Sequence, residues 1–379
     1  MLKAGYEIGV HAMRSLCQEA SNNGEGILLL DFANAFNTVD RNLMISLTAK
    51  DCPELTNLTW WLYKLQPWLV TSRGDVIRSS TGTQQGCRLS NPLFALTMQW
   101  IGGKLKEVEG LRKPLFFWDD TALIGTPEAL ARATKILTNC ADQTGLRLKW
   151  KKCHLYALPD TIAKCKTLQF PSAMTLHENF NMTYLQAPIG DDQFVRRWLQ
   201  KKLQKLDQIV SLVSAMPHKH EAATLLRNSA AVCRVVYLMR ILPPTQISAF
   251  ITQFDGRLRR GFEQILGTPM DDIRWEIAKL PPKYGGMGWK SGSHTYGAHY
   301  IASLTKTSDT VCSISPTHAP LRIAKDNAHE WLRKIAPPRV TIEMLINTIR
   351  STVPERENRN LAKIKLSISQ QCDEWTGRR

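Results

Sequence analysis

Two short apolar segments separated by a pair of aspartates constrain this chain more than any other feature of its sequence. Residues 115–118 (LFFW) and 121–124 (TALI) have the length and composition of strands, and only Asp119 and Asp120 separate them. This spacing predicts a tight β-hairpin with both acids at its tip. Because Asn-Gly or Asp-Gly suits such turns better and adjacent carboxylates repel one another, the pair predicts a bound cation.

A third acid follows another strand-like segment. Residues 27–30 (ILLL) form the continuous apolar run expected of a central strand covered on both faces, and the run ends at Asp31. If this strand lies beside the hairpin, Asp31 converges with Asp119 and Asp120. Oxygen ligands of this kind suit Mg²⁺ or Mn²⁺, and a pair of such ions can activate a 3′-hydroxyl and stabilise a leaving pyrophosphate.

Two other acidic pairs, Asp191-Asp192 and Asp271-Asp272, lack apolar strands on either side. They are interpreted as helix-start and loop acids. The flanking strands therefore distinguish Asp119-Asp120 from an ordinary acidic pair.

The order of elements predicts an α+β fold. Between residues 26 and 158, short apolar strands alternate with helices, one opening at Ser90 and another running from Thr126 to Gly145. This order resembles a split β-α-β-β-α-β sheet. From residue 192 onward the periodicity is mostly helical.

Composition indicates the class of partner. The chain of 379 residues carries 49 Lys and Arg against 33 Asp and Glu, a formal charge of +16, which favours a polyanion. No run of about 20 apolar residues indicates a membrane span. The nine scattered cysteines, which form no C-x-x-C pair, predict reduced thiols in an intracellular protein. Nucleic acid is the expected polyanion.

Several segments in sequence order resemble the palm motifs of reverse transcriptases, in the style of non-LTR retrotransposons. They are residues 31–40 (DFANAFNTVD), 82–86 (GTQQG), 117–120 (FWDD) and 145–146 with 152–153, and similar downstream segments occur at 184–190 and 284–288. The resemblance implies a right-hand polymerase palm at 1–160 and a helical thumb-like region at 192–270. A linker at 161–191 would join them, and a helical region of unknown role would occupy 271–379.

The same resemblance implies roles for individual residues. Asp31, Asp119 and Asp120 would be the catalytic acids, with Asp31 and Asp119 as the principal metal ligands, Asp120 as a secondary one and the Phe32 carbonyl as a further ligand. Phe36 would exclude a 2′-hydroxyl, with a core aromatic as the alternative. Gln85 and Gly86 would shape the loop under the incoming nucleotide, although a plain turn also explains Gly86. Lys152 would lie near the pyrophosphate, with a solvated lysine at a strand end as the alternative.

Three cations in the thumb-like region recur at helical spacing. Arg197, Lys201 and Lys205 occupy positions i, i+4 and i+8, so they share one face of a helix. The resemblance implies that this face tracks the phosphates of a duplex. A solvated helix face is the alternative.

The pattern departs from the family at two places, and two functions stay open. Cys87-Arg88 stands where Asp-Pro is common, and only about 30 residues precede Asp31, too few for the expected finger strands. One hypothesis is an RNA-directed DNA polymerase with two divalent ions, an RNA template, a primer and dNTPs, aided by a separate fingers-bearing chain. The other is a non-catalytic RNA-binding scaffold in a ribonucleoprotein. The nucleus and the mitochondrion are both open as the compartment, and no membrane partner is expected.

Overall fold

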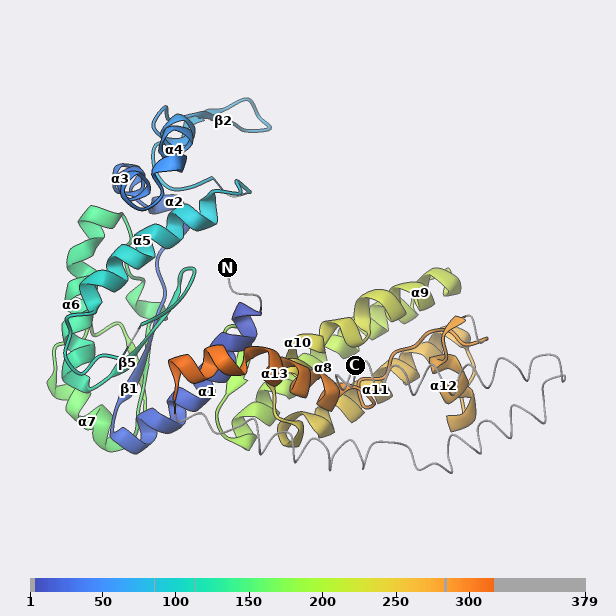
Figure 1. Ribbon diagram of the computed structural model, residues 1–379. Helices are drawn as coiled ribbons and strands as arrows, with labels where there is room; N and C mark the ends of the chain where they lie inside the picture. Colours follow the sequence, from blue (N-terminus) through green and yellow to red (C-terminus); the bar gives the residue numbers. More distant parts are fainter. Residues whose placement is uncertain (1–3, 85, 113, 283–284, 317–379) are drawn as a thin grey trace. The chain divides into compact units, whose positions relative to one another are not determined.

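The computed structural model describes residues 4–84, 86–112, 114–282 and 285–316 (Figure 1). The chain divides into two compact units, one formed by Met13–Leu185 and the other by Met1–Ala12 together with Gln186–Arg379. The division falls inside the first helix, α1 (Gly5–Asn23). Each unit is described by itself.

The unit formed by Met13–Leu185 contains a five-stranded sheet in the order β4-β5-β1-β6-β7. The central strand β1 pairs antiparallel with both β5 and β6, and β7 adds a parallel edge strand beside β6. The predicted split β-α-β-β-α-β arrangement is thus confirmed within an α+β fold. The strands are β1 (Gly26–Leu30), β4 (Leu115–Phe117), β5 (Asp120–Gly125), β6 (His154–Tyr156) and β7 (Thr175–His177).

Two helices, α5 (Ser90–Leu105) and α6 (Pro127–Thr144), pack against each other and share one core with the sheet. Their buried faces meet alternate residues of β1, because side chains on a strand alternate between its two faces. That core includes Leu28, Leu30, Phe94, Ile101, Leu123, Leu130 and Leu137. The start of α6 is fixed by Thr126, whose hydroxyl accepts a hydrogen bond from the amide of Ala129, and Pro127 follows at the first helical position.

An insertion between β1 and α5 carries a concentration of exposed apolar side chains. It consists of α2 (Ala35–Thr38), α3 (Arg41–Asp51), a 3-10 turn (Pro53–Leu55), α4 (Thr56–Tyr63) and the ribbon β2 (Trp68–Val70) with β3 (Val76–Arg78). Every residue of the ribbon is exposed. The ribbon therefore adds nothing to the core, and side-chain contacts elsewhere in the insertion must hold it to the sheet.

The segment 161–191, interpreted from the sequence as a linker, is instead structured. It contains most of α7 (Pro159–Thr167), then β7, β8 (Met182–Tyr184) and β9 (Ala187–Ile189). β7 pairs with β6 in the main sheet, and Met182 and Tyr184 are buried. Strands of three residues are too short to show a period of two, so the pattern in the sequence resembled a loop.

The second unit is mostly helical in its described part, as the sequence predicted for the residues from 192 onward. Its helices are α8 (Asp192–Ser214), α9 (Lys219–Leu225), α10 (Val236–Ile241), α11 (Pro244–Leu266), α12 (Asp272–Lys279) and α13 (Tyr296–Ile314). α8 packs on α11, and α10 packs on α13. Much of the predicted C-terminal region, residues 317–379, lies outside the described residues.

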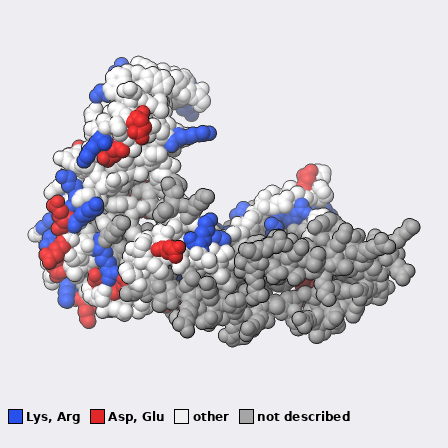
Figure 2. Space-filling model, in the orientation of Figure 1, with Lys and Arg blue, Asp and Glu red and all other residues white. Residues whose placement is uncertain are grey.

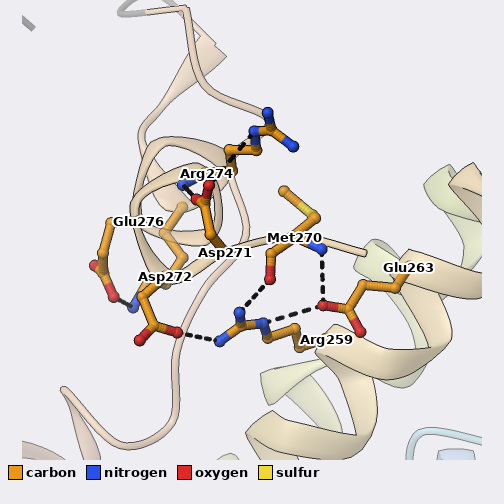
Figure 3. A network of polar contacts seen from close by, with 8 residues as sticks. Arg259, Glu263, Met270, Asp271, Asp272, Arg274 and Glu276 are labelled. Carbon is orange, nitrogen blue, oxygen red and sulfur yellow. Dashed lines mark hydrogen bonds and ion pairs between the residues drawn. The ribbon is translucent and has the colours of Figure 1, made fainter. Parts of the chain in front are cut away.

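Polar contacts fix the connection from α11 to α12 (Figure 3). The guanidinium of Arg259 donates to Asp272 at 2.6 Å, to Glu263 at 3.3 Å and to the carbonyl of Met270. Asp271 accepts a hydrogen bond from the amide of Arg274 at 2.7 Å, which caps α12. Asp191 caps α8 in the same way, so Asp191-Asp192 and Asp271-Asp272 both lie at helix starts, as predicted.

None of the described helices has both the length and the apolar content needed to cross a bilayer. The cysteines within the described residues are free thiols, and Cys372 lies outside them. Figure 2 shows Lys and Arg interspersed with Asp and Glu over the α6 and α7 side of the sheet unit. That face therefore presents no continuous positive surface.

Candidate active site

Asp31 directly follows the central strand of the sheet. β1 ends at Leu30, and the backbone beyond it stays attached because the main-chain carbonyl of Asp31 accepts a hydrogen bond from the amide of Lys149 at 2.8 Å. Phe32 continues this attachment through an antiparallel bridge to Leu148. The side chain of Asp31 is 37% exposed. A rigid strand end thus presents this carboxylate to solvent.

The hairpin of β4 and β5 differs by one residue from its predicted register. Phe117 pairs with Asp120, so the two turn residues are Trp118 and Asp119, and Asp120 begins β5. Trp118 has a φ of 58°, a conformation that glycine normally supplies at the first position of a tight hairpin turn. The prediction that both acids form the tip was therefore wrong for Asp120.

The register of β1 and β5 brings two of the acids together. Leu30 is paired with Thr121, so the next residue on each strand places Asp31 across from Asp120. Both carboxylates line a cavity of about 140 Å³. Partial burial raises the pKa of the Asp120 carboxyl above its ordinary value, and the negative charges of Asp119 and Asp31 raise it further. The three acids therefore interact electrostatically, and a bound cation would relieve this repulsion.

The predicted metal site is assembled only in part. Within the described residues, no group of three His, Cys, Asp or Glu side chains lies close enough to hold a metal ion. Asp31 and Asp120 line the cavity, whereas Asp119 does not, and both Asp119 and Asp120 are exposed. Mg²⁺ commonly takes one or two carboxylates together with substrate phosphates and water. The pair Asp31 and Asp120 fits that pattern, and a closed cage made by the protein alone does not form.

Lys152 lies at the same cavity, in a 3-10 turn (Trp150–Lys152) just before β6. Its ammonium nitrogen is 3.6 Å from Oδ2 of Asp31. Both side chains are more than a third exposed, so solvent screens the pair and its contribution to stability is small. The contact brings a positive charge to the acids.

Two of the residues predicted to contact the nucleotide, Phe36 and Gly86, lie between β1 and α5. Phe36, in α2, is half-buried and packs against the core, and its ring centroid is 6.1 Å from that of Trp118. Gly86 is exposed with a φ of 91°, and Gln85 lies outside the described residues. Phe36 thus lies near the hairpin turn and is not part of the cavity lining.

Residues 6–186 match the family described as "Reverse transcriptase (RNA-dependent DNA polymerase)". This segment belongs to the reverse transcriptase family. The matched residues contain the whole sheet and all three acids.

Two curated relatives come from retrotransposable elements. The chain is 21% identical over 302 residues to the retrotransposable element SLACS 132 kDa protein of Trypanosoma brucei gambiense, covering 75% of this chain and 24% of that protein. It is 31% identical over 144 residues to the Pol polyprotein from type-1 retrotransposable element R2 of Nasonia vitripennis, covering 35% of this chain and 14% of that protein. The chain thus spans a quarter or less of either relative. These matches show that the reverse transcriptase domain is of the non-LTR retrotransposon type.

Two solved telomerase structures are also similar. The telomerase of Candida albicans, solved with a fragment of telomeric RNA, aligns with a TM-score of 0.36 and 11% identity over 83% of this chain and 52% of that one. The apo telomerase of Candida tropicalis aligns with a TM-score of 0.37 and 12% identity over 86% of this chain and 56% of that one.

The reverse transcriptase domain has site residues that sequence reasoning missed. His154 and the segment 183–185 line the cavity together with Asp31 and Asp120. Nδ1 of His154 is 3.1 Å from Nε2 of His177, and burial lowers the pKa of both imidazoles. A usable signal existed for His154, because it is the first residue of the strand expected after Lys152. When that strand pairs with β1, His154 lies beside Leu29.

The three predicted cations of the helical unit share one face of α8. Arg197, Lys201 and Lys205 are exposed, and the opposite face buries Leu199, Leu203 and Leu206. None of the three cations forms an ion pair with another residue in the described part of the chain. They are therefore available to an external anion.

Proposed function

We propose that this chain is the catalytic core of an RNA-directed DNA polymerase that uses divalent ions, Mg²⁺ or Mn²⁺, at Asp31, Asp119 and Asp120. The observation that carries the proposal is the position of Asp31 across from Asp120 at the end of paired strands, where both line one cavity. The RNA template, the primer and dNTPs are the proposed substrates.

The proposed roles follow from what the side chains can do. Asp31, at the end of β1, and Asp119, on the hairpin turn, would be the principal metal ligands. Asp120 would be a secondary acid at the start of β5, and the Phe32 carbonyl would be a further ligand. Bound Mg²⁺ would polarise the 3′-hydroxyl and stabilise charge on the leaving pyrophosphate. The ammonium of Lys152 would donate a proton to that leaving group, because it already lies beside the acids.

Other residues would select and bind the substrates. The ring of Phe36 would occupy the space that a 2′-hydroxyl needs, and the backbone around Gln85 and Gly86 would lie under the nucleotide. Arg197, Lys201 and Lys205 would bind phosphates of the template and primer duplex through α8.

The test is primer extension on an RNA template with Mg²⁺ or Mn²⁺, with the chain alone and with finger segments supplied in trans. Asp31→Asn and Asp119→Asn should abolish extension without lowering the melting temperature. Asp142→Asn, which removes an exposed acid on α6, is the matched control and should extend normally. Extension that persists in either active-site variant contradicts the metal assignment. Tight RNA binding without extension, unchanged by Asp31→Asn, would identify a non-catalytic scaffold instead.

A further inference from the structure

A buried arginine joins three parts of the insertion. Arg41, the first residue of α3, is only 5% exposed. Its Nε donates to the carbonyl of Gly82 at 2.8 Å, and its Nη2 donates to the hydroxyl of Ser79 at 2.7 Å. Nη1 donates to the carbonyls of Tyr63 and Ser79. The guanidinium carbon also lies 5.4 Å from the centroid of the Tyr63 ring. One side chain therefore ties α3 to the end of α4 and to the segment 79–82.

The charge of Arg41 is not matched by a carboxylate. No acid of the described residues lies within ion-pair distance of its guanidinium, and its partners are carbonyls, one hydroxyl and one aromatic ring. Burying an unpaired charge is costly, and well-packed apolar residues often replace such groups without loss of stability. What an apolar residue cannot supply is a planar fork of N–H donors with fixed directions. The arrangement therefore specifies geometry at some cost in stability.

The segment that Arg41 holds is also joined to the backbone around Phe36. The amide of Thr83 donates to the carbonyl of Phe36 at 2.6 Å, and the amide of Gly82 donates to the carbonyl of Val39 at 2.9 Å. Thr81 adds a side-chain hydrogen bond to the carbonyl of Asn37 at 3.0 Å. Segment 79–83 thus lies between Arg41 on one side and residues 36–39 on the other.

Gly82 shows how close this approach is. Its φ is 71°, and a Cβ at this position would lie 2.3 to 2.5 Å from backbone atoms of Asn37. Only glycine fits there, because any side chain would force the two backbones apart. A displacement of segment 79–83 would therefore be transmitted to the backbone that carries Phe36.

We propose that Arg41 is a positioning residue. It fixes the backbones of segments 36–39 and 79–83, which are hydrogen-bonded to each other, and thereby sets nucleotide selection. The inference rests on the proposed polymerase function and deepens it. Arg41 acts through these backbones and touches no substrate. Loss of its donor fork should change the binding of the incoming nucleotide and the discrimination against ribonucleotides. Binding of the primer and template, which depends on other residues, should change little.

The test compares two arginines of the same unit. Arg41→Lys keeps the charge but loses the fork, and Ser79→Ala removes one acceptor if the first variant folds poorly. Arg112→Gln is the matched control, because Arg112 is also partly buried but binds Glu19 and Glu25 on α1 and in the loop after it. KM for dNTP, the ratio of kcat/KM for deoxy- and ribonucleotides, the Kd for primer–template and the melting temperature are measured for each.

Arg41→Lys should raise KM for dNTP and lower the discrimination ratio by about tenfold or more, because misplacements of about 1 Å remote from the chemistry have such effects. Ser79→Ala should change both in the same direction by less. The primer–template Kd should change by less than about twofold, since the phosphate contacts lie elsewhere. Arg112→Gln should lower the melting temperature and leave the ratio unchanged. Equal loss of stability with an unchanged ratio in Arg41→Lys would reduce Arg41 to a structural residue.

Amide hydrogen exchange separates this inference from the proposed function. Arg41→Lys should speed exchange at the amides of Gly82 and Thr83, whereas Arg112→Gln should not. If these amides stay protected, the positioning role is overturned whatever the enzyme does. If these amides exchange faster in Arg41→Lys but the unmodified chain extends no primer, the polymerase proposal fails. The linkage between Arg41 and the backbone then stands.

Discussion

The ring of Phe36 is stacked on the ring of Phe94, with centroids 4.3 Å apart and planes inclined by 24°. Phe94 is fully buried in α5, whereas Phe36 is half-buried and also approaches Trp118 in the hairpin turn. The two interpretations of Phe36, a core aromatic and a sugar gate, are therefore compatible. One face of the ring is fixed by the core, and its other contact is with the turn that carries Asp119.

Replacing Phe36 by Ala should let the enzyme incorporate ribonucleotides, because the space for a 2′-hydroxyl would be opened. The expected readout is a shift in the ratio of kcat/KM values for deoxy- and ribonucleotides, and not only a lower rate. Stability should fall by about 2 kcal/mol, less than for a fully buried ring. Phe94→Leu is the control, since it removes the same stacking without opening the site. An active Phe36→Ala variant with unchanged discrimination would leave Phe36 as a core aromatic.

Sequence patterns predicted the elements whose signals are local. The apolar run ending at Asp31, the capped helix α6 and the two N-capping aspartates all follow from a few adjacent residues. The turn register was missed because Trp118 adopts a positive φ that its side chain disfavours, and no local rule predicts that. The helix expected to open at Ser90 does begin there, but the Ser90 hydroxyl caps no amide of α5 and donates to the carbonyl of Gln84. Arg41 was missed because its hydrogen-bond partners are distant in sequence.

The strain at Trp118 can be measured by comparing two substitutions. Trp118→Gly and Trp118→Ala both remove the ring, but only Ala keeps a Cβ at a φ of 58°. The Gly variant should therefore be the more stable by about 1 kcal/mol in urea unfolding. Trp100 within α5 is the control, and the order should reverse there because Ala favours a helix over Gly by about 1 kcal/mol. Equal stability of the two variants at position 118 would show that the turn relaxes without cost.

The pair His154 and His177 should make stability depend on pH. Burial lowers the pKa of both imidazoles below the ordinary 6.5, and the charge of His154 lowers that of His177 further. These two imidazoles therefore bind protons more readily in the unfolded chain than in the folded one. The associated stability is fully present above about pH 6.5 and is lost as pH falls through the folded-state pKa values. Urea unfolding at about pH 7.5 and 5.5 should show a smaller loss in the double variant His154→Gln/His177→Gln than in the unmodified chain. The same loss in both would mean that these imidazoles keep their ordinary pKa when folded.

The face of α8 with Arg197, Lys201 and Lys205 should determine how strongly nucleic-acid binding depends on salt. Each phosphate contact releases counterions, so the log of affinity falls with the log of salt by about 0.9 per contact on duplex DNA and about 0.7 on a single strand. Replacing the three cations together by Gln should make that slope shallower by roughly two to three units.

The matched control removes the same charge from a different face. Arg132, Lys135 and Lys164 are exposed on α6 and α7, where acidic side chains lie among the basic ones (Figure 2). Their replacement by Gln lowers the net charge equally, so an equal change in slope would mean that only the overall field matters. A change confined to the α8 variant requires local phosphate contacts, because long-range attraction is screened beyond about 10 Å at 0.1 M salt. Unchanged slopes in both variants would leave α8 with a solvated face, and the phosphates would then have to be bound by other cations of the chain.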